Sequence, residues 1–336
     1  MHDSELVPPP PESLPRPTEA WAPLPPPPEP DWLLARARRR RRPTRLWVHL
    51  VLLLLTILTT SAWGLAHYLS FVGGFAGRVP PVNVTAVLGA FWYSGTVLAI
   101  LGCHEMGHYL ACRFYGIDAT LPFFLPAPIV ITGTFGAVIR IRDMFPDRRS
   151  LFDVGIAGPI AGFVIAVPAL FLGLWLSHVE AVPAGFTGYS LGEPLLFKAA
   201  AWAVWGNVAD GFSINLHPVG FAAWLGLIVT SLNLIPIGQL DGGHISYAVL
   251  GRRKSLWVTA TGITAGVLVA AYYRSVTLGV FVVLTIAMLV IGGLRHPATL
   301  DDGVALGQSR MALAILAIVM LILCFTPVPI EELLPH

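Results

Sequence analysis

The sequence predicts an all-α polytopic membrane protein, with about six transmembrane helices and a short β-hairpin that re-enters the membrane. Of the 336 residues, 55% are hydrophobic and only 12% are charged, and the mean hydropathy is +0.71. These values are typical of chains that cross a membrane several times. Apolar segments recur along the chain, and basic residues gather in alternate loops between them, as at 140–149 and 252–254. We expect those loops on the cytoplasmic side.

Residues 1–43 form a separate region. Twelve of the first thirty residues are proline, a composition that cannot bury a core and favours disorder or polyproline II. A solvated tail and a segment bound by a proline-recognising partner both fit this composition. The region ends in an arginine cluster, which should keep the N-terminus in the cytoplasm and can contact anionic membrane lipid. Residues 44–336 are then expected to be the transmembrane domain.

The apolar segments follow in order. The first span is expected at 46–69 and the second at 84–112. The third, at 151–176, contains small residues that permit close approach of a neighbouring helix. A segment at 221–235 re-enters the membrane, two closely joined spans follow at 256–273 and 276–294, and the last lies at 311–325.

Residues 120–142 do not have the pattern of a spanning helix. Prolines interrupt the segment, and the stretches at 129–132 and 135–141 are β-prone, with Gly133 and Thr134 able to form the turn between them. The segment is therefore expected to form a hairpin that dips into the membrane, where protein or water must cover its irregular backbone. The alternative is a loop at the cytoplasmic surface.

The sequence His104-Glu105-Met106-Gly107-His108 lies inside the second apolar segment. Ionisable residues at such a place are costly and predict a functional site. On a helix, His104 and His108 share one face about 6 Å apart along the axis, so that both imidazoles can bind one zinc ion. Glu105, one position along, can act as general base toward a water activated by the metal. This H-E-x-x-H spacing is typical of zinc peptidases.

A catalytic zinc ion needs a third protein ligand. The positions at which a metzincin would carry Gly and a third His are Ala111 and Phe114, and the next glutamate, Glu180, lies in a loop expected outside the membrane. Asp241 is the best candidate, because it lies at the cytoplasmic end of another apolar segment among prolines and glycines that let the backbone turn. The alternative interpretation of Asp241 is a simple helix-terminal carboxylate.

Together these motifs resemble the site-2 protease family of intramembrane zinc metalloproteases. The resemblance covers roughly residues 84–250, the expected catalytic core, and its motifs are 104–108, Gly133-Thr134-Phe135-Gly136, Gly158-Pro159-Ile160-Ala161-Gly162 and Asn233-x-x-Pro236-x-x-x-x-Asp241-Gly242. The resemblance implies one zinc ion per chain, held by His104, His108 and Asp241, with Glu105 as the base. It also implies that the hairpin at 120–142 pairs with substrate as an added strand, with residues 133–136 as candidate substrate-binding residues. Asn233 would bind substrate backbone or an oxyanion, or else cap a broken helix.

The resulting hypothesis is an intramembrane endopeptidase that cleaves the transmembrane segment of a single-pass protein. A divalent-metal transporter and an inactive scaffold that binds membrane helices are the alternatives. The net charge of +2 and the bunching of basic residues at loop ends argue against a nucleic-acid partner. We expect a multi-pass protein of the bacterial cytoplasmic membrane, although the sequence is also compatible with an organelle membrane.

Overall fold

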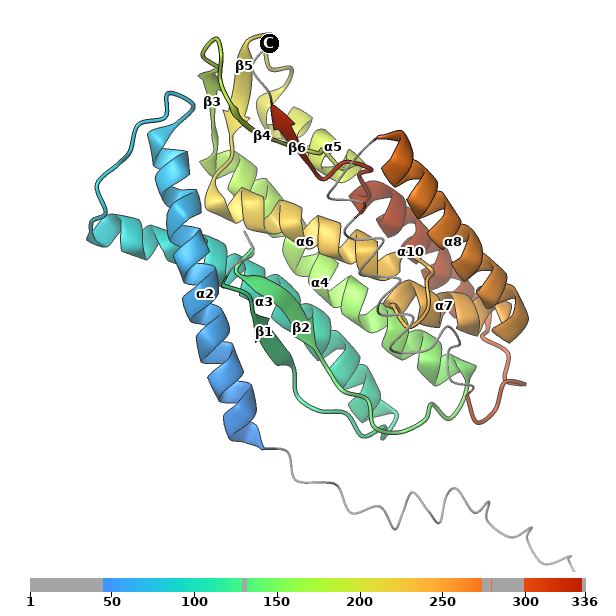
Figure 1. Cartoon of the computed structure of the whole chain (residues 1–336). Coiled ribbons are helices and arrows are strands. Elements are labelled where there is room, and N and C mark those ends of the chain that lie inside the picture. The colour runs from blue at the N-terminus through green and yellow to red at the C-terminus, as the bar shows by residue number, and fades with distance from the viewer. Residues whose placement is uncertain (1–44, 129–131, 274–278, 280–298, 334–336) are drawn as a thin grey trace, which may run out of the picture. The chain divides into compact units, whose positions relative to one another are not determined.

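Four long helices carry most of the apolar sequence. The computed structural model describes residues 45–128, 132–273, 279 and 299–333, and these helices are α2 (Leu46–Gly73), α3 (Val84–Phe114), α4 (Arg148–Leu176) and α8 (Arg252–Tyr272). Each is long and apolar enough to cross a membrane. Shorter helices among the described residues are α5 (Leu195–Trp205), α6 (Pro218–Leu234), α7 (Asp241–Leu250) and α10 (Gln308–Cys324). The chain is a mostly helical, multi-pass membrane protein (Figure 1).

The apolar segments expected at 46–69, 84–112, 151–176 and 256–273 are confirmed as helices of membrane-spanning length. The segments at 221–235 and 311–325 form α6 and α10, which have 17 residues each. The span expected at 276–294 lies outside the described residues, apart from residue 279. The whole N-terminal region 1–43 also lies outside them, as does its arginine cluster apart from Arg45. The count of about six spans therefore stays a prediction.

Three pairs of short antiparallel strands complete the described fold. Strand β1 (Phe123–Pro126) pairs with β2 (Thr134–Val138) to form a hairpin. Strand β3 (His178–Ala181) pairs with β5 (Phe212–Asn215), and β4 (Gly188–Leu191) pairs with β6 (Ile330–Leu333). The β1–β2 hairpin lies beside α2 and α3 (Figure 1).

The hairpin differs in detail from the predicted one. Its first strand is β1, before the expected 129–132, of which 129–131 lie outside the described residues. Thr134 is not a turn residue, because it is the first residue of β2 and pairs with Pro126. The two phenylalanines of β1 favour a strand, and Pro126 is tolerated where the register shifts at the strand end. The first strand therefore lies earlier in the chain than the β-prone run at 129–132 predicted.

Hydrogen bonds from two helices hold the tip of the hairpin. The Thr59 hydroxyl of α2 donates to the Gly133 carbonyl at 2.7 Å, and the Tyr93 hydroxyl of α3 donates to the Thr132 carbonyl at 2.7 Å. Gly133 has φ +71°, and a side chain there would lie 2.7 Å from the Thr59 carbonyl oxygen. Only glycine fits such a position without strain, so that Gly133 allows the hairpin to dock on α2.

Helices α3, α4 and α6 share one core, in which Ile100, Leu170 and Leu227 are buried together. The contact between α3 and α4 is close because Gly107 of α3 faces the backbone carbonyl of Ala157, as small residues at helix interfaces allow. The Asp147 side chain caps α4 by accepting from the Ser150 backbone N–H at 2.8 Å. These contacts fix α4 along the face of α3 that carries the two histidines.

Candidate metal centre

Helix α3 places His104 and His108 one turn apart on its buried face. Their Nε2 atoms lie 3.1 Å from each other, and His104, His108 and Glu105 are each 9% exposed or less. Two imidazoles that meet through ring nitrogens in an apolar interior are costly unless a shared partner satisfies them. The sequence predicts this juxtaposition from the spacing of four residues, and α3 provides it.

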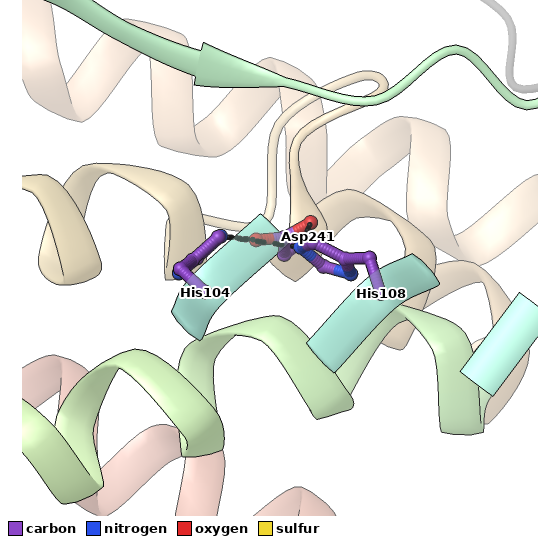
Figure 2. Close-up of side chains that lie close together, drawn as sticks. All are labelled: His104, His108 and Asp241. Carbon is purple, nitrogen blue, oxygen red and sulfur yellow. Dashed lines mark hydrogen bonds and ion pairs between the residues drawn. The ribbon is translucent and has the colours of Figure 1, made fainter. Parts of the chain in front are cut away.

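Asp241 reaches the same place from the start of α7. Its Oδ2 lies 3.2 Å from His104 Nε2, and its Oδ1 lies 3.3 Å from His108 Nε2. Figure 2 shows the three side chains pointing toward one another. The turn from α6 into α7 is tight, because Gly242 and Gly243 lie directly against backbone carbonyls of residues 234 and 238, where a side chain would overlap. These glycines let the chain turn sharply enough to bring the carboxylate to the histidines.

The donor set fits a zinc ion. Ligand atoms at about 2.0 Å from a tetrahedral ion lie roughly 3.3 Å from one another. Here the two Nε2 atoms are 3.1 Å apart, and each faces a different carboxylate oxygen of Asp241, at 3.2 and 3.3 Å. Among the residues that the structure describes, His104, His108 and Asp241 are the group of three or more potential ligands whose atoms converge in this way. Two imidazoles and one carboxylate are a ligand set that catalytic zinc sites use, with a further position open to water.

Glu105 lies beside this cluster without belonging to it. Its Oε1 is 4.0 Å from His104 Nε2, and its carboxylate lies near the backbone N–H of Ile139, the residue that follows β2. The carboxylate thus lies next to the ligands and beside the hairpin. This is where a general base for metal-assisted hydrolysis should lie.

Comparison with known proteins supports the same chemistry. A family model described as peptidase family M50 matches residues 92–273, which is more than half of the chain. The chain belongs to peptidase family M50. The resemblance to the site-2 protease family is thereby confirmed.

Curated relatives of this M50 protein are named as zinc metalloproteases. The chain is 34% identical over 165 residues to "Probable zinc metalloprotease EGY2, chloroplastic" of Arabidopsis thaliana, which covers 49% of this chain and 29% of the relative. It is 29% identical over 310 residues to "Probable zinc metalloprotease EGY1, chloroplastic" of the same plant, which covers 85% of this chain and 54% of the relative. The matches thus span between 29% and 54% of the length of these relatives. No solved structure matches.

Asn233, in the last turn of α6, lies at the metal centre of this M50 protein. Its Nδ2 is 3.3 Å from His104 Nε2, so that the structure brings it next to one of the expected metal ligands, and its role stays a prediction. The four hairpin residues 133–136 make other contacts. Thr134 is buried and its hydroxyl donates to the Leu125 carbonyl at 2.8 Å, whereas Phe135 is 66% exposed. Gly133 and Thr134 serve the hairpin itself, and substrate contact by 133–136 stays a prediction.

The sequence did not reveal what α4 contributes to the metal centre. The Nδ1 atom of His108 lies 2.7 Å from the backbone carbonyl oxygen of Val154, and Gly158, one turn along α4, faces the His108 ring with no space for a side chain. Gly162 faces His104 in the same way, with an added Cβ 3.1 Å from its Cβ. The only signal in the sequence was the small-residue pattern at 155–162, which predicts close packing but not its partner.

Gly158→Ala is therefore expected to weaken zinc binding. The added methyl group would overlap the imidazole of His108, so either the ring or α4 must move, and overpacking of this kind is poorly accommodated in a close-packed interior. We expect a loss of zinc affinity of roughly 10–100-fold, the range seen when the surroundings of metal ligands are disturbed. Titration of the metal-free protein with zinc measures it.

Two other glycine substitutions serve as an intermediate case and a control. Gly162→Ala should have a smaller effect because its contact is less severe, and Gly102→Ala should have almost none. Gly102 lies two residues from His104 on α3, but an added Cβ meets only Phe124, at an ordinary 3.5 Å. Equal affinities for all three variants would show that α4 does not shape the site.

Proposed function

We propose that this chain is an intramembrane zinc endopeptidase that cleaves transmembrane segments of membrane-anchored proteins. The observation that carries the proposal is the convergence of His104, His108 and Asp241 at distances that fit zinc ligands. They lie beside Glu105 of α3, a helix long enough to cross a membrane. Family membership supports it, and so do relatives named as probable zinc metalloproteases.

His104, His108 and Asp241 would hold the zinc ion. When bound, zinc lowers the pKa of water toward about 7 and polarises the carbonyl to be attacked. Glu105 accepts the proton that the attacking water loses and returns it to the leaving amine. Glu105 is buried beside the ligands, with its Oε1 4.0 Å from His104 Nε2, so that the base is already near the metal when substrate arrives.

We assign a substrate-facing role to Asn233. Its amide lies within 3.3 Å of His104 Nε2, and an amide N–H at this place can donate to a substrate carbonyl as negative charge develops on its oxygen. The alternative, that Asn233 caps the end of α6, gains no support from the caps of that helix: the Ile235 N–H at its C-terminal end bonds to backbone carbonyls of 231 and 232.

The β1–β2 hairpin is the proposed substrate platform. A helical substrate has its carbonyls hydrogen-bonded internally and must unwind before cleavage, which addition to a strand edge would favour. Docking of the hairpin on Thr59 and Tyr93, inside the apolar helices α2 and α3, supports a hairpin that re-enters the membrane. The exposed ring of Phe135 would then contact the substrate or lipid.

We propose a topology of about six spans with the N-terminus in the cytoplasm. The basic residues at 140–149, before and at the start of α4, and at 252–254, in the first turn of α8, support this orientation. In this orientation the metal centre would lie near the cytoplasmic interface, where water can enter. The relatives are named as chloroplastic plant proteins, which does not support the expected bacterial membrane over an organelle membrane. A single-pass protein substrate, membrane lipid and a partner for the proline-rich tail are the proposed partners.

The test is reconstitution of the purified chain in liposomes with a model transmembrane peptide. We expect one zinc ion per chain, cleavage within the apolar segment of the peptide, loss of cleavage after chelation and recovery on adding zinc. Zinc accumulation inside the liposomes without proteolysis would instead favour a transporter. Peptide binding without cleavage in the zinc-loaded protein would favour a scaffold.

A further inference from the structure

His108 is oriented by a backbone group of a helix that supplies no ligand. A carbonyl oxygen can only accept a hydrogen bond, so the 2.7 Å contact with Val154 requires the proton on Nδ1 of His108. In the neutral ring the lone pair is then on Nε2, the atom that faces Asp241 at 3.3 Å. Second partners of this kind fix the tautomer and the direction of metal-binding histidines. The position of Val154 on α4 therefore affects metal binding.

The residue before Val154 is the centre of a polar cluster that joins three helices. The Arg310 guanidinium of α10 binds both carboxylate oxygens of Asp153, at 2.8 Å from Nε to Oδ1 and 2.6 Å from Nη2 to Oδ2. The Tyr115 hydroxyl, at the end of α3, donates to the same carboxylate and accepts from Arg310 at 3.3 Å. Bidentate, charge-assisted bonds of this type have a fixed geometry, and both charged side chains are only 25% exposed.

The residue after Val154, Gly155, packs against α7, the helix that carries the third proposed ligand, Asp241. An added Cβ on Gly155 would lie 2.9 Å from the Cβ of His244 and 3.5 Å from the backbone oxygen of Asp241. Three consecutive residues of α4 thus contact the polar cluster, the ring of His108 and the helix that carries Asp241.

This part of α4 also lacks a full set of helical hydrogen bonds. Pro159 has no N–H, so the carbonyl of Gly155 has no donor four residues along the helix. The helix therefore lacks one of its own hydrogen bonds at Gly155, next to Val154, and contacts from outside the helix contribute more to the local geometry there.

We propose that Arg310 is a positioning residue for the metal centre: together with Tyr115 it holds Asp153, and so places the Val154 carbonyl that orients His108. Arg310 contacts neither the metal ligands nor the proposed substrate platform, and it acts through α4. The inference rests on the metal-binding part of the proposed function.

Zinc affinity and the spectrum of bound cobalt test this in the full-length chain in detergent. The metal-free protein is titrated with zinc against a competing indicator and, separately, with Co²⁺, whose visible absorption reports ligand geometry. Arg310→Met is expected to lose roughly 10–100-fold in zinc affinity and to change the Co²⁺ spectrum. Arg310→Lys, which restores the charge with a single nitrogen, should recover part of the affinity.

Arg142→Met is the matched control. Arg142 pairs with Asp118 at 3.3 Å, and these side chains are 24% and 28% exposed, so the variant removes a comparable ion pair at the base of the hairpin. It should keep the wild-type zinc affinity and Co²⁺ spectrum. If Arg142→Met lost as much affinity as Arg310→Met, the effect would be general and the inference would be wrong.

Tyr115→Phe covers the case in which Arg310→Met does not fold, as judged by helicity and elution. It removes one oxygen from the cluster and should weaken zinc binding less than Arg310→Met while changing the Co²⁺ spectrum in the same direction. Wild-type affinity and spectrum in whichever variants fold would overturn the inference but leave the proposed function standing. Failure of the wild-type chain itself to bind zinc would overturn both.

Discussion

Glu105→Gln is expected to retain one zinc ion per chain and to lose cleavage by roughly 10²–10⁴-fold, the usual contribution of a general base. The amide has almost the size and shape of the carboxylate, so the cluster of His104, His108 and Asp241 should persist. It cannot take a proton from water, however, and therefore cannot pass one to the leaving amine. Metal analysis measures the zinc content, and the rate of peptide cleavage in liposomes measures the loss of activity.

Glu193→Gln controls for the chemical change itself. Glu193 makes an ion pair with Lys198 at 3.8 Å, in which both side chains are more than half exposed. Glu193 lies just before α5 and Lys198 lies in its first turn, away from the metal centre. The variant should cut at the wild-type rate. Cleavage by Glu105→Gln at that same rate would show that Glu105 is not the base.

Asp241→Asn is expected to abolish zinc binding at concentrations that saturate the wild-type chain. Asp241 is the sole anionic ligand in the cluster, and it faces both histidines at 3.2 and 3.3 Å. A neutral amide is a weak zinc ligand, so the loss of affinity should exceed the roughly 10–100-fold that follows changes around the ligands. Metal content after dialysis against a zinc buffer measures it, and cleavage should disappear with the metal. His104→Ala should behave in the same way.

Asp210→Asn makes the same substitution at an exposed position in the loop between α5 and β5. It should bind one zinc ion per chain. Circular dichroism separates loss of metal from loss of fold in either variant. A folded Asp241→Asn chain with a full zinc complement would remove Asp241 from the ligand set.

Side-chain chemistry explains how much of the site could be predicted from the sequence. His104 and His108 belong to one helix, and their spacing fixes their relation to each other without knowledge of the rest of the fold. Asp241 could be selected because proline and glycine residues around it predict a sharp turn at the right depth. Asn233 was recognised through the family motif, and its role stayed open because an amide also caps helices.

The contribution of α4 could not be predicted, for two physical reasons. Val154 acts through its backbone carbonyl, which every residue has, and Gly158 acts through the absence of a side chain. The cluster of Tyr115, Asp153 and Arg310 joins residues on three helices, and a single sequence carries no sign of which helices meet. The first strand of the hairpin was misplaced because Pro122 and Pro126 concealed the β-prone phenylalanines between them.

Because the turn before α7 brings Asp241 to α3, metal binding should affect the stability of the whole chain. A bound ion would tie together two helices that are distant in sequence, much as a covalent cross-link does, and ligand binding to the folded state alone stabilises that state by mass action. Zinc supply would then govern how much of the protein survives in the bilayer as well as how fast it works. A cell short of the metal would lose the enzyme itself.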